Sequence, residues 1–375
     1  MTTSTINIPD AYSFPSNSPE IGVEIERVCK VIEATATHKI VVLKPVIDKL
    51  RLTFSGLGVI QHVDGLQAEA YWSGVHQLAN YVAQATDEPS ITPCSVEGYW
   101  TGLRVELEGG GVATFGFNPR NAKNAAVRLE FNPSRLSPAG LKSLFAAWNS
   151  IEGKNIPLAA HLTSARVSRC DVALDVLNLR LADLFVHSPA VWKVWMCSSM
   201  TDGVQTINFY KGAKNQSPFL DPKKRANVII YDKREERLAM GEVPEFGSLA
   251  HTRIEFHLNK TSYFKNLANT QFPAKDWVFC RTVLDEPPLK ADRWKTFLDS
   301  ARFRGYAAAE ALLDEDEKAA LDLAHSNPAS QFQDLFDKSV WKHWPDAVGV
   351  PALALLIELA SVHPSEMIGQ SKFAL

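Results

Sequence analysis

Residues 166–176 read RVSRCDVALDV, a run in which apolar and polar side chains alternate. One set of alternate positions is apolar and consists of Cys170, Val172, Leu174 and Val176. The other set consists of Arg169, Asp171, Ala173 and Asp175. Successive side chains of a β-strand point to opposite faces, so the run predicts a strand with one apolar face and one charged face.

The same alternation, together with a helical period of 3.6 residues, predicts an order of elements that occurs twice. The first half would hold a strand at 48–54, a helix near 66–86, strands at 99–107, 112–118 and 127–131, and a helix at 137–150. The second would hold the strand at 166–176, a helix near 181–195, strands at 204–212, 227–233 and 252–258, and a short helix at 261–269. Each half then reads β-α-β-β-β-α, which predicts an α+β fold with mainly antiparallel sheets.

A short echo supports the duplication, because the tetrapeptide RLEF at 128–131 resembles RIEF at 253–256. A chain of 375 residues is too long for one modest core. We therefore expect four parts: an N-terminal leader and helix, a first α+β half, a second half that carries the functional site, and a helical C-terminal region. Their expected bounds are 1–44, 45–160, 161–275 and 276–375.

Composition excludes several classes of protein. Apolar residues make up 46% and charged residues 22% of the chain, which is typical of soluble globular proteins. The longest apolar stretch, near the C-terminus, contains Pro351 and Glu358 and is too short to span a bilayer, and the first twenty residues do not resemble an export signal. The five cysteines have no metal-site or redox spacing and suit a reducing cytoplasm. A net charge of -3 disfavours a protein that coats DNA, but a local basic site is compatible with it.

The polar faces of three predicted strands would together carry an unusual set of charges. Arg253, Glu255 and His257 alternate with apolar residues in one strand, and Tyr231 and Lys233 alternate in another. A solvated sheet face is the simplest explanation. Aspartate is disfavoured inside strands, however, so Asp171 and Asp175 favour an oxygen site for Mg²⁺ or Mn²⁺.

Tyr231 has two interpretations as well. Most strand tyrosines pack, with the hydroxyl at the rim. Aligning FGFNPRN at 115–121 with IIYDKRE at 229–235 puts Phe117 in the place of Tyr231, which predicts that packing alone does not need the hydroxyl. Tyr210 is the rival for a chemical role, because it shares the polar side of its predicted strand with Thr206 and Asn208.

Three motifs in this order resemble the replication initiation factor family, the rolling-circle initiators of staphylococcal-type plasmids and their relatives in filamentous phages. They are SRCDVALDV, VIIYDKREERL and HTRIEFHL, with a weaker match at VIDKLRLTFSG. The resemblance covers about residues 45–262. It implies sequence-specific DNA nicking and joining at an origin, in the cytoplasm of a bacterial host, through a 5′-phosphotyrosine intermediate.

Carried over to this sequence, the resemblance makes Tyr231 the nucleophile. A tyrosine hydroxyl needs a nearby cation or base, and Lys233, Arg253 or the metal is expected to stabilise its phenolate. It makes Asp171, Asp175 and Glu255, together with Asp48, the ligands of Mg²⁺ or Mn²⁺. We expect DNA to be contacted by a set of basic residues: Arg169, Arg253, Lys211, Lys223, Lys224, Arg225 and Arg234.

The sequence differs in one feature from better-known initiators, which bind metal through two histidines that flank an apolar residue. No such pair occurs here, and His251 and His257 are six positions apart. Two other functions stay open: a DNA-binding regulator without catalysis, and a metal-dependent nuclease that uses water. The expected partner is single-stranded or hairpin origin DNA. Recruitment of a host helicase or polymerase and formation of a homodimer are open, and no membrane partner is expected.

Overall fold

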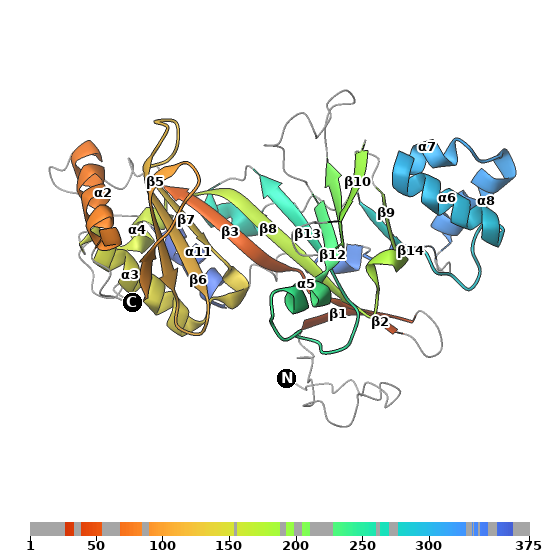
Figure 1. Cartoon of the computed structure of the whole chain (residues 1–375), viewed down its shortest axis with the longest axis horizontal. Helices are drawn as coiled ribbons and strands as arrows, with labels where there is room; N and C mark the ends of the chain where they lie inside the picture. The colour runs from red at the N-terminus through yellow and green to blue at the C-terminus, as the bar shows by residue number, and fades with distance from the viewer. Residues whose placement is uncertain are drawn as a thin grey trace. The chain divides into compact units, whose positions relative to one another are not determined.

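We describe a computed structural model of the chain (Figure 1). The described residues are 27–33, 39–54, 68–84, 90–153, 156–187, 193–198, 205–210, 228–259, 263–269, 277–327, 332, 334–336, 338–343 and 351–362. The fold is α+β with a mostly antiparallel sheet, as the alternation predicted. None of the helices in these ranges combines the length and the apolar composition that crossing a bilayer requires.

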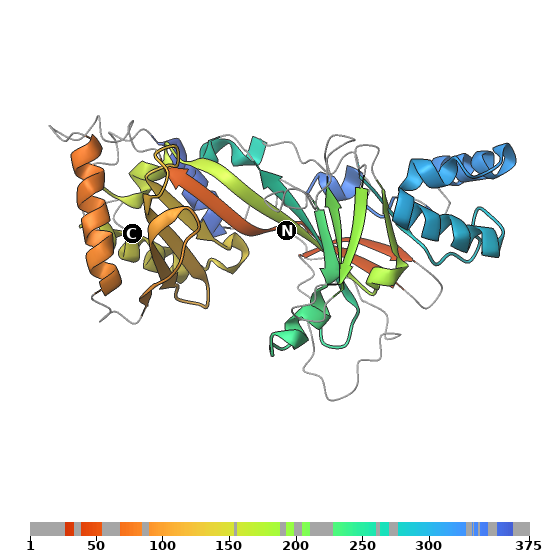
Figure 2. The ribbon, with the colours of Figure 1, turned by 45° about the horizontal axis from the view of Figure 1, so that its top comes forward.

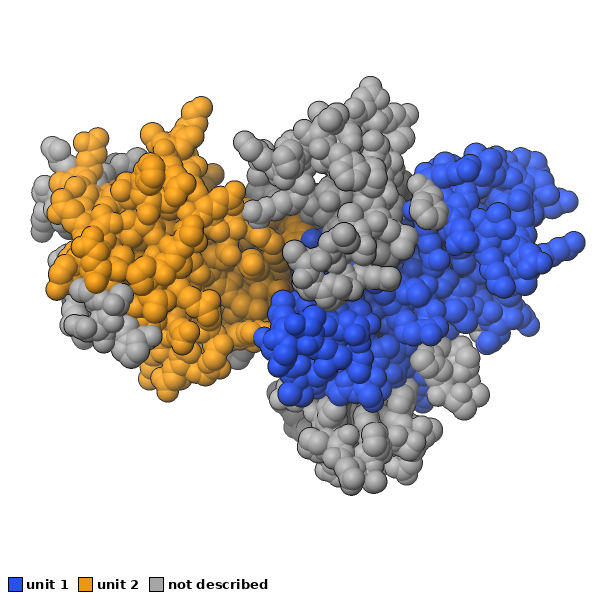
Figure 3. Space-filling model, viewed as in Figure 1, with its two compact units in different colours: residues 1–45, 173–256, 272–344 blue, residues 46–172, 257–271, 345–375 orange. Residues whose placement is uncertain are grey.

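The chain forms two compact units (Figure 3). Unit 1 consists of Met1–Pro45, Ala173–Phe256 and Phe272–Trp344, and unit 2 of Val46–Val172, His257–Gln271 and Pro345–Leu375. The chain changes unit after residues 45, 172, 256, 271 and 344, so each unit combines segments that are far apart in the sequence. The four expected parts stay a prediction.

Most described strands belong to one sheet, in the order β10-β11-β12-β13-β8-β3-β7-β6-β5-β4. These strands are β10 (Lys193–Ser198), β11 (Gln205–Tyr210), β12 (Val228–Asp232), β13 (His251–Asn259), β8 (Arg166–Leu177), β3 (Val46–Phe54), β7 (Val127–Phe131), β6 (Val112–Pro119), β5 (Tyr99–Glu106) and β4 (Ile91–Pro93). Off this path, β2 (Lys39–Leu43) pairs with β8 and with β1 (Val28–Glu33). The strands predicted from alternation therefore occur where they were expected.

In unit 2, helices cover the apolar face of β3, β7 and β6. They are α2 (Ala68–Gln84), α3 (Pro138–Glu152), α4 (Leu158–Leu162) and α11 (Pro351–Ser361), and a 3-10 turn (Pro133–Arg135) precedes α3 (Figure 2). Ser137 caps α3 by accepting a hydrogen bond from the Gly140 amide, and Gly153 ends the helix with φ 82°. The fully buried Trp148 ring of α3 packs on Phe54 and Phe115 from the strands. The polar residues of these strands therefore lie on the face that the helices do not cover.

Unit 1 has a second core beside a two-stranded sheet of β9 (Leu184–His187) and β14 (Val278–Arg281). The described helices of unit 1 are α5 (Lys233–Ala239), α6 (Ala291–Arg304), α7 (Tyr306–Glu310), α8 (Glu315–Ser326) and α9 (Lys338–Trp341). Phe185 of β9 belongs to the same cluster of buried side chains as Trp294 and Phe297 of α6. Asp314 and Glu317 form a capping box at the start of α8.

Several predicted elements differ from the observed ones. The helix predicted near 181–195 is wrong in the described part of this segment, which holds a 3-10 turn (Leu181–Asp183), β9 and the start of β10, because its short apolar run is buried by pairing with β14. Residues 188–192 lie outside the described residues. The helix expected within 1–44 is absent from the described part, which forms β1 and β2. The short helix at 261–269 is a 3-10 helix (Phe264–Asn269). The C-terminal region, expected to be helical, also contains β14, and Gly305, with φ 87°, separates α6 from α7.

Candidate functional site

In unit 1, a buried carboxylate in β8 is held by two residues of β13. Arg253 donates to both oxygens of Asp175, from Nε over 2.7 Å and from Nη2 over 2.8 Å. His251 Nε2 lies 2.8 Å from Asp175 Oδ1. Burial alone would raise the pKa of Asp175, but the charge and hydrogen bonds of Arg253 and His251 hold it well below its usual range. Asp175 is therefore a charged group already neutralised within the protein.

Tyr231 lies on β12 in the same unit and pairs with Arg253 of the neighbouring strand β13. Its hydroxyl donates to Glu255 Oε1 over 2.6 Å. The residue is only 8% exposed. Burial raises the pKa of the Tyr231 hydroxyl, and the negative charge of Glu255 raises it further, against the opposing charge of Arg253. Tyr231 and Glu255 thus form a partly buried, hydrogen-bonded donor and acceptor pair.

The alternation predicted that Lys233 continues the strand of Tyr231. In the structure Lys233 instead begins α5. The change follows from Asp232, whose side chain accepts a hydrogen bond from the Glu235 amide and caps the helix. The Lys233 ammonium lies 5.5 Å from the centre of the Tyr231 ring and 2.5 Å from Glu236 Oε2. Lys233 is therefore a cation over the ring face, and its role in stabilising a phenolate stays a prediction.

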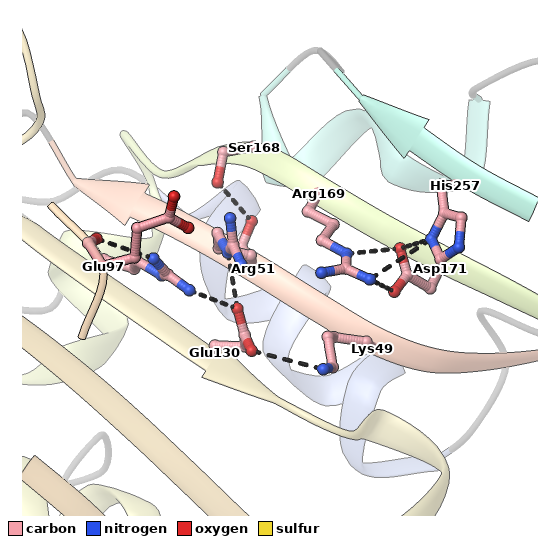
Figure 4. Close-up of polar contacts among 9 residues, drawn as sticks. Lys49, Arg51, Glu97, Glu130, Ser168, Arg169, Asp171 and His257 are labelled. Atoms are coloured by element: carbon pink, nitrogen blue, oxygen red, sulfur yellow. Dashed lines mark hydrogen bonds and ion pairs between the residues drawn. The ribbon is translucent and has the colours of Figure 1, made fainter. Parts of the chain in front are cut away.

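In unit 2, Asp171 of β8 has a matching pair of partners (Figure 4). Arg169 donates to Asp171 from Nε over 2.8 Å and also pairs through Nη2, while His257 Nδ1 lies 2.8 Å from Asp171 Oδ1. Burial would raise the pKa of Asp171, but His257 and Arg169 lower it below its usual value. The other ring nitrogen of His257 is buried without a hydrogen-bond partner among the described residues.

The four predicted metal ligands are thus in contact with protein groups. Asp175 pairs with Arg253, Asp171 with Arg169, Glu255 with Tyr231, and Asp48 accepts a hydrogen bond of 3.3 Å from Asn132. The described side chains include no cluster of three or more His, Cys, Asp or Glu residues arranged to hold a metal. The divalent ion stays a prediction of the family resemblance.

The predicted DNA contacts are placed only in part. Lys211, Lys223, Lys224 and Arg225 lie outside the described residues. Arg253 is buried against Asp175, Arg169 is paired with Asp171, and Arg234 is paired with Glu235 on α5.

The equivalence predicted between Phe117 and Tyr231 is wrong in register. Phe117 pairs with Val127 and lies fully buried on the core face, whereas Tyr231 pairs with Arg253 on the polar face. Arg128 matches Arg253 in the tetrapeptide echo. The strand partner of Arg253 is Tyr231, whereas the strand partner of Arg128 is Gly116. A shift of one residue reverses the face of a strand, so Phe117 gives no information about the hydroxyl of Tyr231.

Sequence reasoning named His251 and His257 only for their spacing and polarity, and it missed their pairing with the two aspartates. It also missed a group of charges on β3 and β7, in which Arg51 and Arg128 contact Glu130. The available signal was the alternation of Lys49, Arg51 and Thr53 with apolar residues. No protein-family model and no curated protein matches this sequence.

Proposed function

We propose that the chain is a DNA nicking and joining enzyme that initiates rolling-circle replication at a phage or plasmid origin, with Tyr231 as its nucleophile. The observation that supports this most is the 2.6 Å hydrogen bond from the Tyr231 hydroxyl to Glu255. A tyrosine hydroxyl is a weak nucleophile at neutral pH and needs a neighbouring base. Glu255, which accepts this hydrogen bond, would accept the proton.

The reaction follows from this pair. As the Tyr231 oxygen bonds to the phosphorus of a phosphodiester, its proton passes to Glu255 and the bond from phosphorus to the 3′ oxygen breaks. The leaving 3′ oxygen takes up a proton and becomes a free 3′-OH primer. The 5′ phosphate stays linked to Tyr231, so attack by another 3′-OH reverses the step and joins the strand.

Glu255 in this proposal acts as a base, whereas the family resemblance makes it a metal ligand. A divalent ion bound there would polarise the scissile phosphate. The steps above need no such ion, and dependence on Mg²⁺ or Mn²⁺ is a separate outcome of the experiment below.

Tyr210 is the second candidate nucleophile, and two observations on Tyr231 favour it. Burial to 8% exposure limits the access of DNA to Tyr231, and a raised pKa disfavours its phenolate. Tyr210 is the last residue of β11, the strand that pairs with β12, and it follows Thr206, the partner of Tyr231, by four positions.

We also propose that the two halves arose by duplication. On either side of the neighbouring β8 and β3, the strand order runs β13-β12-β11-β10 and β7-β6-β5-β4. The tetrapeptide echo falls on β13 and β7, which occupy corresponding places in this order. Because Gly116 lies opposite Arg128, the first half has no tyrosine at the place of Tyr231, and the chemistry belongs to the second half alone.

The test is incubation of the full chain with a pool of random single-stranded oligonucleotides labelled at the 3′ end, with Mn²⁺, with Mg²⁺ or with chelator. Denaturing electrophoresis should show label that migrates with the protein, and Tyr231→Phe should abolish it while Tyr210→Phe should not. An adduct lost only in Tyr210→Phe would transfer the role to Tyr210. Cleavage without an adduct would favour a nuclease that uses water, and binding without either would favour a regulator.

A further inference from the structure

The polar face of the unit 2 sheet carries three cations around one carboxylate (Figure 4). Arg51 Nε donates to Glu130 Oε2 over 2.6 Å, and Arg128 Nη2 donates to the same oxygen over 2.8 Å. Lys49 Nζ lies 3.7 Å from the other oxygen, Oε1. Arg51 pairs with Glu130 in the register of β3 and β7, so the strands themselves fix this arrangement.

Arg169 extends this group and leaves it with excess positive charge. It pairs with Asp171 on β8 and is close enough to Arg51 to influence it electrostatically. Burial lowers the pKa of Arg51, and the like charges of Arg128 and Arg169 lower it further, against the opposing effect of Glu130. The ion pairs join three cations to Glu130 and join Arg169 to Asp171, so four cations share two carboxylates.

A charge network that only braces a sheet gains nothing from unbalanced charge, because partly buried like charges repel one another. The side chains of Arg51 and Arg128 are 16% and 13% exposed, and that of Lys49 is 40% exposed. The excess charge is therefore within reach of a ligand from solvent. Guanidinium groups and an ammonium group are the protein's usual partners for phosphate.

An exposed aromatic ring lies at one end of the same unit's sheet. Tyr263 is 42% exposed and pairs with Arg166, the first residue of β8, through an isolated bridge. The Arg166 guanidinium carbon lies 4.7 Å from the centre of the ring, and Lys265 Nζ lies 5.9 Å from it. The Arg166 carbonyl accepts a hydrogen bond from the Thr53 hydroxyl, which connects the ring to the strand of Arg51.

We propose that these cations and the Tyr263 ring at the end of β8 form a binding site for single-stranded DNA. The group of Lys49, Arg51, Arg128 and Arg169 would hold backbone phosphates, and Tyr263 would stack on an unpaired base. Cationic surfaces with aromatic rings are how proteins bind single strands with little sequence preference. The inference concerns binding alone, so it stands or falls independently of the nucleophile in unit 1.

The test measures fluorescence anisotropy of a labelled 20-nucleotide oligothymidylate with the full chain carrying Tyr231→Phe and Tyr210→Phe, which removes both candidate nucleophiles. We expect Tyr263→Ala to weaken binding about 5-fold or more through lost stacking. We expect Lys49→Ala to weaken it severalfold and to reduce the slope of log affinity against log salt by about 0.7. Both side chains are exposed enough that folding should be unaffected, which circular dichroism checks.

Matched controls come from the same unit. Tyr81 is a 67% exposed tyrosine on α2, and Lys142 is an exposed lysine on α3, whose helix covers the opposite face of the sheet. Tyr81→Ala and Lys142→Ala should leave affinity unchanged. Equal effects of the test and control variants would overturn the proposal, and so would tighter binding of a duplex of the same length.

Discussion

Replacing Arg253 by methionine should destabilise the protein through Asp175, which would be left in a buried site without its main counter-charge. Asp175 is 1% exposed, and both of its oxygens accept hydrogen bonds from Arg253. Removing one partner of a buried ion pair costs about 3–5 kcal/mol, because the remaining charge is desolvated without compensation. Methionine keeps most of the side-chain length, so lost packing adds little.

The loss of stability in Arg253→Met should depend on pH. In the wild type the pKa of Asp175 lies below its unfolded value, so its stabilising contribution is present above the unfolded pKa and is lost only as the pH falls through the lower folded value. In Arg253→Met only His251 remains to oppose burial, so the pKa of Asp175 rises relative to the wild type. The folded variant then binds protons more readily than the folded wild type, and its loss of stability should be smaller at pH 5 than at pH 8.

Urea denaturation followed by circular dichroism at both pH values measures the effect. Arg180→Met is the control, since Arg180 forms an exposed ion pair with Asp183 and its removal should change little. The double variant Arg253→Met with Asp175→Leu should recover most of the lost stability. A loss below about 1 kcal/mol in Arg253→Met at pH 8 would refute the reasoning that Asp175 depends on this pair.

Four further predictions concern single positions. Glu255→Gln should slow adduct formation about 10²- to 10⁴-fold, because an amide cannot take the proton of Tyr231, and unchanged single-turnover rates would remove Glu255 from the reaction. Burial lowers the pKa of His161 to about 3, so the wild type should lose about 2 kcal/mol of stability in urea between pH 6.5 and pH 5, and His161→Gln should lack this loss. Gly116→Ala should destabilise by about 1–3 kcal/mol in thermal unfolding, because its Cβ would lie 2.8 Å from Val96 Cγ1. Gly74→Ala, in an open position on α2, should instead stabilise by about 0.5–1 kcal/mol.

The sequence predicted those parts of the fold that depend on local patterns. Strands such as β7 and β8 follow from alternation, and α3 begins at Ser137 with its expected cap. The pattern failed at 181–195, where a short apolar run fits a helix or a strand equally well and pairing with the distant β14 decides between them. Local caps also override a continuing pattern, as Asp232 does at the end of β12.

The candidate site was predicted in its residue types but not in its contacts. Alternation placed Tyr231, Arg253 and Glu255 on one polar face, which the register of β12 and β13 confirms. It did not reveal that Asp171 and Asp175 each have an arginine and a histidine as partners. Those contacts depend on which strands become neighbours, and no local pattern contains that information.

The measurement that tests the central claim most directly is identification of the residue that carries DNA. Protein incubated with the single-stranded pool would be digested with nuclease and protease, and its peptides analysed by mass spectrometry for a nucleotide phosphate on tyrosine. The account predicts that this modification lies on Tyr231 and is absent from Tyr231→Phe. A modification on Tyr210, or cleaved DNA with no modified tyrosine at all, would contradict it.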